Sequence, residues 1–127
     1  MSRPELRGEA GSSTVLAVGL IAALLTVTLG ALAVLGTVRA AHLARSAADL
    51  SALAGAIEYQ QRPDAGAACV EAGRVAARHD VVVLACEAAG GGEVTVTVSA
   101  RIPLRLGGVG PDHAEGRARA GPSPEDG

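Results

Sequence analysis

The first hydrophobic feature of the chain is an uninterrupted apolar segment at residues 15–38, which holds no charged residue, no proline and no side-chain amide. In a helix this segment spans about 36 Å, more than the roughly 30 Å hydrocarbon core of a bilayer. Its many Leu, Ile and Val residues favour insertion by on the order of 4–8 kcal/mol. The pattern predicts a transmembrane helix over residues 14–38. The polar leader over residues 1–13 is too short to fold alone and is expected to be disordered.

The helical pattern continues beyond the apolar segment. Residues 39–61 are rich in Ala and Leu, which favour helix, and contain no proline. A narrow stripe with a seven-residue repeat, suited to close helix packing, is formed by Leu43, Ala47, Leu50, Ala54 and Ile57. We expect one continuous helix, its first half in lipid and its second half outside. It should end before Pro63, because a residue that precedes proline disfavours the α conformation.

The hydrophobic pattern then predicts a small α/β domain over residues 62–106. Residues 65–79 form a short Ala-rich helix in this interpretation. The β-branched run at 81–87 predicts a buried strand, and residues 93–101 alternate Val with Thr or Ser, which is typical of a strand with one buried face. A glycine-rich turn joins the two strands into an antiparallel hairpin, with the short helix packed on its valine face.

Composition limits the core and the tail. The chain has 127 residues with no Phe, no Trp and one Tyr, so a core of Ala, Val, Leu and Ile is expected to be marginally stable unless it is cross-linked. Residues 107–127 are dense in Gly, Pro and charge and are expected to be a disordered tail. The predicted fold class is α+β and membrane-anchored: a long transmembrane helix that continues outside the membrane, then a small helix with a β-hairpin.

Cys69 and Cys86 are the only cysteines, and they fall on the predicted short helix and the first predicted strand. A disulfide between them closes a loop for which the chain-entropy model gives about 3 kcal/mol. It also requires an oxidising compartment, which favours a C-terminal domain outside the cell. The alternative is two small, buried, apolar thiols. Two cysteines without a paired histidine offer too few ligands for a metal.

No constellation of residues suggests chemistry. The three histidines, His42, His79 and His113, lie in separate segments without metal-ligand spacing and are expected at the surface. The glycine run at residues 90–92 does not open a helix, so it lacks the geometry of a phosphate cradle. The formal charge of −2 is scattered and gives no basic patch for nucleic acid. We expect no catalytic residue, cofactor, metal or small-molecule substrate, and hence no enzyme.

Small residues recur every four positions inside the apolar segment, at Ala22, Thr26 and Gly30. Such spacing lets helices approach closely in lipid. With the seven-residue stripe, it predicts a helix interface with another membrane protein. Arginines flank both ends of the segment, so the positive-inside rule does not choose an orientation. The short leader and the cysteine pair favour a single-pass protein of the cell membrane, with a cytoplasmic N-terminus and an extracellular domain.

The order of these segments resembles the TadE/TadG-like proteins of tight-adherence (Flp) pilus systems. It is most similar to the short actinobacterial TadE-like proteins of the helicase/secretion neighbourhood group. The resemblance rests on GSSTVL at residues 11–16 and AADLSALA at residues 47–54, which is similar to the "AADxAALA" segment of TadG-like N-termini. It implies a pilin-like helix in a minor pseudopilin-like, non-enzymatic component of a pilus assembly or secretion system, with other proteins of that system as partners.

The resemblance also implies prepilin-peptidase cleavage after Gly11. Pilin-type substrates usually carry Glu five residues past the cut, where this chain has Leu16. A retained anchor is therefore the prediction, and cleavage after Gly11 is the alternative. Two other functions stay open. One is a membrane-anchored accessory or regulatory subunit of another membrane complex, and the other is a secreted binding module released by signal cleavage after Ala33.

Overall fold

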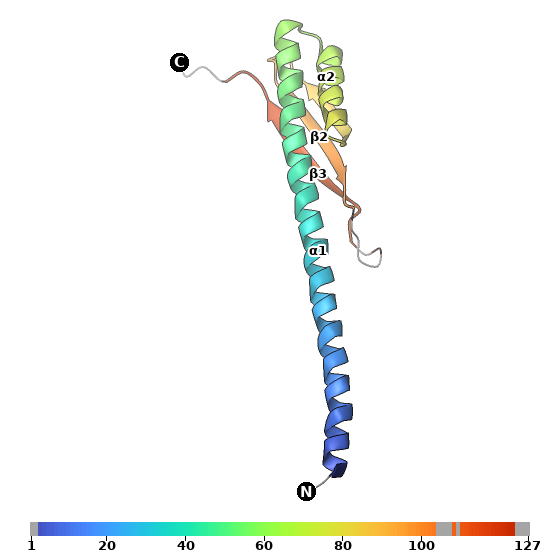
Figure 1. Ribbon diagram of the computed structural model, residues 1–127. Coiled ribbons are helices and arrows are strands. Elements are labelled where there is room, and N and C mark those ends of the chain that lie inside the picture. Colours follow the sequence, from blue (N-terminus) through green and yellow to red (C-terminus); the bar gives the residue numbers. More distant parts are fainter. Residues whose placement is uncertain (1–2, 104–107, 109, 124–127) are drawn as a thin grey trace.

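The protein, seen in a computed structural model, is described at residues 3–103, 108 and 110–123, with side chains from residue 11 onward. It has an α+β fold of a long helix, a second helix and a three-stranded antiparallel sheet (Figure 1). The elements in chain order are α1 (Arg3–Gln61), α2 (Ala65–Arg78), β1 (Val82–Ala88), β2 (Val94–Arg101) and β3 (His113–Ala120).

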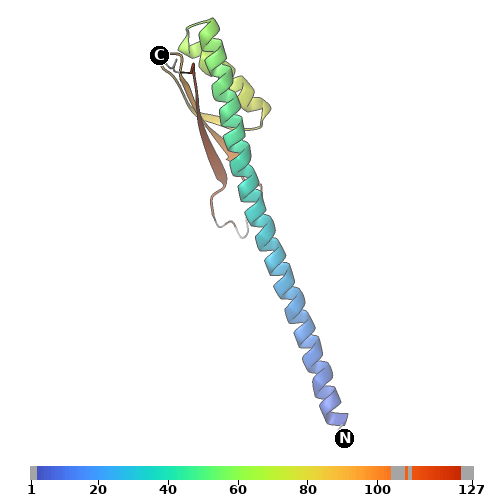
Figure 2. The same ribbon diagram turned by 90° about the vertical axis from the view of Figure 1, so that its left-hand side faces the viewer.

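The long helix α1 runs for 59 residues without a break. Its N-terminal part projects away from every other element, whereas its C-terminal part lies along α2 and the sheet, in both views (Figures 1 and 2). A continuous helix through residues 14–61 was expected and is present.

The expectation of a disordered leader over residues 1–13 is wrong from Arg3 onward, because α1 already begins there; residues 1–2 lie outside the described residues. The leader extends a helix that exists already, so it avoids the cost of nucleation. Pro4 also suits a first helical turn, where proline loses no hydrogen bond.

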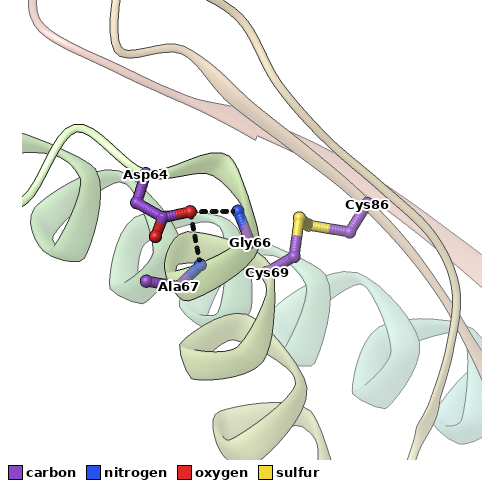
Figure 3. The surroundings of a disulfide bond; sticks show 5 residues. All are labelled: Asp64, Gly66, Ala67, Cys69 and Cys86. Atoms are coloured by element: carbon purple, nitrogen blue, oxygen red, sulfur yellow. Dashed lines mark hydrogen bonds between the residues drawn. A yellow bond between two sulfur atoms is a disulfide. The ribbon is translucent and has the colours of Figure 1, made fainter.

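The second helix starts and stops at local signals. The Asp64 side chain caps its N-terminus, where Oδ1 accepts hydrogen bonds from the backbone N–H of Gly66 (2.8 Å) and Ala67 (3.3 Å) (Figure 3). Just after α2, Asp80 has a φ of 56°, and this left-handed conformation prevents the helix from continuing. The helix predicted at residues 65–79 therefore ends one residue earlier, at Arg78.

The sheet has the order β1-β2-β3, with both neighbouring pairs antiparallel. The predicted hairpin is present, with each strand shifted by one residue at its start. The expectation of a buried strand at residues 81–87 is wrong, because β1 lies at the edge of the sheet with Val82 and Leu84 exposed. The expectation that the short helix covers the valine face is also wrong, because α1 packs on β2. α1 lies against β2 and β3, and α2 lies mainly against β1, so both helices cover one face of the sheet in a two-layer arrangement (Figure 2). Residues 104–106 of the predicted domain lie outside the described residues.

The third strand corrects the expectation of a disordered tail over residues 107–127. β3 occupies His113–Ala120 and pairs with β2 along its whole length. Its sequence, HAEGRARA, alternates small residues with charged ones, and the small residues Gly116 and Ala118 are buried. A strand pressed against a helix needs small side chains on that face, and these give almost no hydropathy signal. Residues 107, 109 and 124–127 of the predicted tail lie outside the described residues.

The core is built from small side chains. α1 and α2 contribute alanines and β2 contributes valines, and the fully enclosed members are Ala44, Ala47, Ala48, Ala52, Ala68, Ala72, Val94, Val96 and Val98. A Cβ added at Gly116 would lie 2.4 Å from the carbonyl carbon and oxygen of Ala44, so β3 and α1 touch backbone to backbone. The single tyrosine, Tyr59, is partly buried against this core.

Candidate functional site

The apolar segment of α1 is exposed along its length, and its last turns border the domain. All thirteen of its Leu, Ile and Val side chains are exposed, from 48% at Val38 to 74% at Val15. Within the described residues, α1 is the one helix long and apolar enough, by length and composition, to cross a membrane, and none of its most apolar window is buried. Exposed apolar surface of this extent marks a place of contact with lipid or protein.

The three threonines of the apolar segment hide their hydroxyl groups within the helix. Each Oγ1 donates to the backbone carbonyl four residues earlier: Thr26 to Ala22 (2.8 Å), Thr28 to Leu24 (2.8 Å) and Thr37 to Ala33 (3.1 Å). A hydroxyl moved into hydrocarbon without a partner is costly, on the order of several kcal/mol. These bonds remove that cost, so the outer surface of the segment can contact hydrocarbon throughout.

The residues predicted at a helix interface separate into two groups. Ala22, Thr26 and Gly30 lie on the uncovered half of α1, where a Cβ at Gly30 would meet nothing within 4 Å. We define the packed half of α1 as residues 40–56. The large side chains on and just beyond this half are partly exposed: 42–48% for Leu43, Leu50 and Ile57, and 51% for Leu53. These four form the leucine stripe of the following paragraphs. An interface there stays a prediction.

Ala47 and Ala54 do not share the exposure of the leucine stripe. Ala47 is fully buried in the chain's own core, and Ala54 is partly buried. The assignment of Ala47 to an external interface is therefore wrong. The reason is that α1 meets the sheet and α2 through its smallest residues, since these allow the closest approach, and turns its leucines outward.

Cys69 on α2 and Cys86 on β1 form a disulfide, with Cα atoms 5.8 Å apart (Figure 3). The pairing predicted from the sequence is present. It fastens the edge strand β1 to the helix layer, at the part of the sheet that α1 does not cover. Nearby on α2, Arg74 Nε donates to Glu71 Oε2 at 3.0 Å. This hydrogen bond lowers the pKa of Glu71 and raises the pKa of Arg74.

The histidines do not come together. His42 is exposed on α1, His113 is exposed at the start of β3, and His79 is partly buried with Nδ1 3.0 Å from the Val75 carbonyl oxygen. Over the part of the chain that the structure describes, no group of three or more His, Cys, Asp or Glu side chains is placed to hold a metal ion. Gly11, after which cleavage was the alternative to a retained anchor, lies exposed inside α1.

A groove lies where the end of β2 approaches α1, at the border of the apolar segment. It has a volume of about 380 Å³ and is lined by Leu32, Leu35, Arg39 and Leu43 of α1 and by Arg101 and Pro103 from the end of β2. Sequence reasoning did not find this groove. Its two sides are far apart in the sequence, and neither carries a motif.

Neither a family model, nor a curated protein, nor a solved structure matches this chain.

Proposed function

We propose that this chain is a non-enzymatic, single-pass membrane protein in which α1 anchors a small disulfide-linked domain. We further propose that it serves as a minor pseudopilin-like component of a Tad/Flp-type pilus assembly or secretion system. The observation that carries the anchor is the apolar segment, whose most apolar window is not buried by the protein and whose threonine hydroxyls are all bonded inside the helix.

A bilayer satisfies the demands of this segment better than water does. Thirteen exposed aliphatic side chains would each remain in contact with water if the helix stood alone in solution. Hydrocarbon removes that unfavourable contact, and the helix already satisfies its own backbone groups, as a membrane span requires. The disulfide supports an orientation with the domain outside the cell and the N-terminus in the cytoplasm, because such bonds persist in oxidising compartments.

The assembly role rests on the leucine stripe. Leu43, Leu50 and Ile57 follow a seven-residue repeat and are each 42–48% exposed, with Leu43 at the edge of the groove beside Arg101. A partner helix packs against such a repeat by inserting side chains between the leucines. The resemblance of residues 11–16 and 47–54 to TadE/TadG-like proteins supplies the class of partner, namely other components of the same pilus or secretion system.

The anchor is tested on the full chain in its native membranes. We expect the protein to resist alkaline carbonate extraction, and its cysteines to react with a membrane-impermeant maleimide in intact cells only after reduction. Labelling that needs broken cells would contradict the orientation. Recovery of the protein from the medium would instead identify a secreted module released after Ala33, and mass spectrometry would show whether the chain starts at Met1 or after Gly11.

The partner class is tested by site-specific photocrosslinking. A photoreactive residue at Leu50 should capture pilins or assembly-platform proteins. The same residue at Val70, which is 73% exposed on α2, is the matched control and should capture neither. Capture of unrelated membrane proteins alone would identify an accessory subunit of another complex and overturn the pilus assignment while leaving the anchor intact.

A further inference from the structure

The groove at the border of the apolar segment combines two kinds of surface. Leu32 and Leu35 belong to the last turns of the apolar segment, and Pro103 faces them from the end of β2. Arg39 is the first charged residue after the segment, and Arg101 reaches the same groove from β2. The groove therefore combines an apolar lining, which includes Leu43, with two arginines.

Both arginines lack a carboxylate partner. No acidic side chain lines the groove, and within the described residues no ion pair joins Arg39 or Arg101 to an Asp or Glu. A second groove on α1 differs in this respect, because Glu115 lies there beside Arg45 and Arg117. Two arginines that form no ion pair with a carboxylate among the described residues, set beside apolar side chains, fit an occupant with a negative head and an apolar tail.

We propose that this groove binds one anionic phospholipid of the leaflet next to the domain. Its phosphate lies between Arg39 and Arg101, and an acyl chain runs along Leu32 and Leu35. This inference rests on the proposed membrane anchor, and it adds a ligand to it. Guanidinium groups bind phosphate through paired hydrogen bonds, which suits a lipid headgroup.

The depth of the groove favours lipid over other occupants. Leu32 and Leu35 lie about 6–10 Å along the helix from Arg39, on its N-terminal side. When the apolar segment spans the bilayer, the arginines stand at headgroup level and the leucines stand among the upper acyl carbons. A soluble anion would contact the arginines and leave the apolar part of the groove in water.

The test uses the purified full chain in detergent micelles, with native mass spectrometry to measure bound lipid. We expect the wild-type protein to retain phosphatidylglycerol in preference to phosphatidylcholine. An arginine near an anionic lipid surface contributes about 1 kcal/mol, so Arg101→Gln should weaken phosphatidylglycerol binding about fivefold. Arg101 is the decisive position, because Arg39 adjoins the apolar segment and its loss also shifts the depth of the helix.

The matched control is Arg78→Gln, which removes the same charge from an exposed position at the end of α2, away from the groove. We expect it to retain wild-type binding. Glycerol 3-phosphate, which has the head but no acyl chain, should not displace the lipid. Hydrogen exchange across β2 and β3 should be the same in both variants, which establishes that the fold is intact.

Three results would overturn the lipid site. They are equal binding of the two lipids by the wild type, equal loss in Arg78→Gln and Arg101→Gln, and displacement of the lipid by glycerol 3-phosphate. The membrane anchor fails by a separate result, carbonate extraction of the native protein. A protein that stays in the membrane without a preference for phosphatidylglycerol refutes only this inference.

Discussion

The two halves of α1 are similar in being rich in alanine but opposite in their surroundings. The apolar segment exposes all its Leu, Ile and Val side chains, and its last turns border the domain at the groove beside Arg101 and Pro103. The packed half, residues 40–56, places alanines in the core although its hydropathy is lower. Burial inside this protein therefore follows the size of a side chain more closely than its hydropathy.

The two halves differ in what covers the helix surface: the chain's own core covers the packed half, and the surroundings of the protein cover the apolar segment. Alanine buries little apolar area, so the packed half gains its stability from close backbone approach and many contacts at short range. The apolar segment exposes large side chains, so its stability depends on whether lipid, another protein or water surrounds it. Four tests examine this contrast, each followed in the full chain by urea unfolding in detergent, with the fluorescence of Tyr59, the single tyrosine in a chain without Phe or Trp, as the signal.

The largest effect is expected for Gly116→Val, which disrupts the closest approach in the packed half. Its Cβ would lie 2.4 Å from backbone atoms of Ala44, so β3 and α1 must separate. The free energy of unfolding should fall by about 3 kcal/mol or more. Gly19→Val is the control in the apolar segment, where a Cβ meets nothing within 4 Å, and it should leave the transition unchanged. Equal transitions for both variants would refute the close packing.

The second-largest effect on stability is expected from removing the disulfide, which joins α2 to β1 and does not involve α1. Replacing both Cys69 and Cys86 by Ser removes a bridge between residues 17 apart in sequence. The chain-entropy model predicts a loss of about 3 kcal/mol in the free energy of unfolding. Retention in the membrane should not change, because α1 does not carry the bridge. A wild-type protein whose unfolding midpoint is the same with and without reductant would contradict this expectation.

A third test changes the size of one side chain on the buried face and one on the exposed face of the packed half. Ala48→Leu places extra volume in a fully buried position and should lower the free energy of unfolding by about 2 kcal/mol. Leu50→Ala removes a side chain that is 43% exposed and should change it by less than about 0.5 kcal/mol. If Leu50→Ala proved the more destabilising of the two, the leucine stripe would have to belong to the core.

The smallest effect has the opposite sign. Ser51 is fully buried on the packed half, and its Oγ has no hydrogen-bond partner among the described residues. Ser51→Ala removes this unsatisfied hydroxyl at nearly constant volume and should raise the free energy of unfolding by about 1 kcal/mol. Ser46→Ala, at an exposed position of the same helix, should be neutral. A destabilised Ser51→Ala protein would indicate a hydrogen bond to water at this site.

The hydrophobic pattern of the sequence predicted the elements whose side chains are large. The apolar run of α1 and the β-branched run of β1 are continuous hydrophobic stretches, and the Val and Thr residues of β2 alternate. The same reasoning missed β3, because its buried positions Gly116 and Ala118 are among the least hydrophobic residues that a core accepts. The alternation of small and charged residues over 113–120 is the signal that would have found it.

Hydropathy also could not predict which face of α1 is buried. The leucine stripe is the more hydrophobic face, yet Ala44, Ala47 and Ala48 form the buried one. Which face a helix buries depends on the surface that it meets, and that surface is made by residues far along the chain. The groove is a similar case, since Arg39 and Arg101 are brought together only by the return of β2 toward the apolar segment.

The contact between Gly116 and Ala44 also gives the molecule a mechanical property. Because the domain is clamped directly to α1, and α1 has no break from Arg3 to Gln61, the domain moves as the helix moves. From Val38 to Gln61 the helix rises about 35 Å, so a tilt of roughly 10° carries its far end sideways by about 6 Å. Long apolar helices adjust their tilt to bilayer thickness. If α1 spans a bilayer, a change in bilayer thickness that tilts the helix therefore displaces the domain sideways by several ångströms.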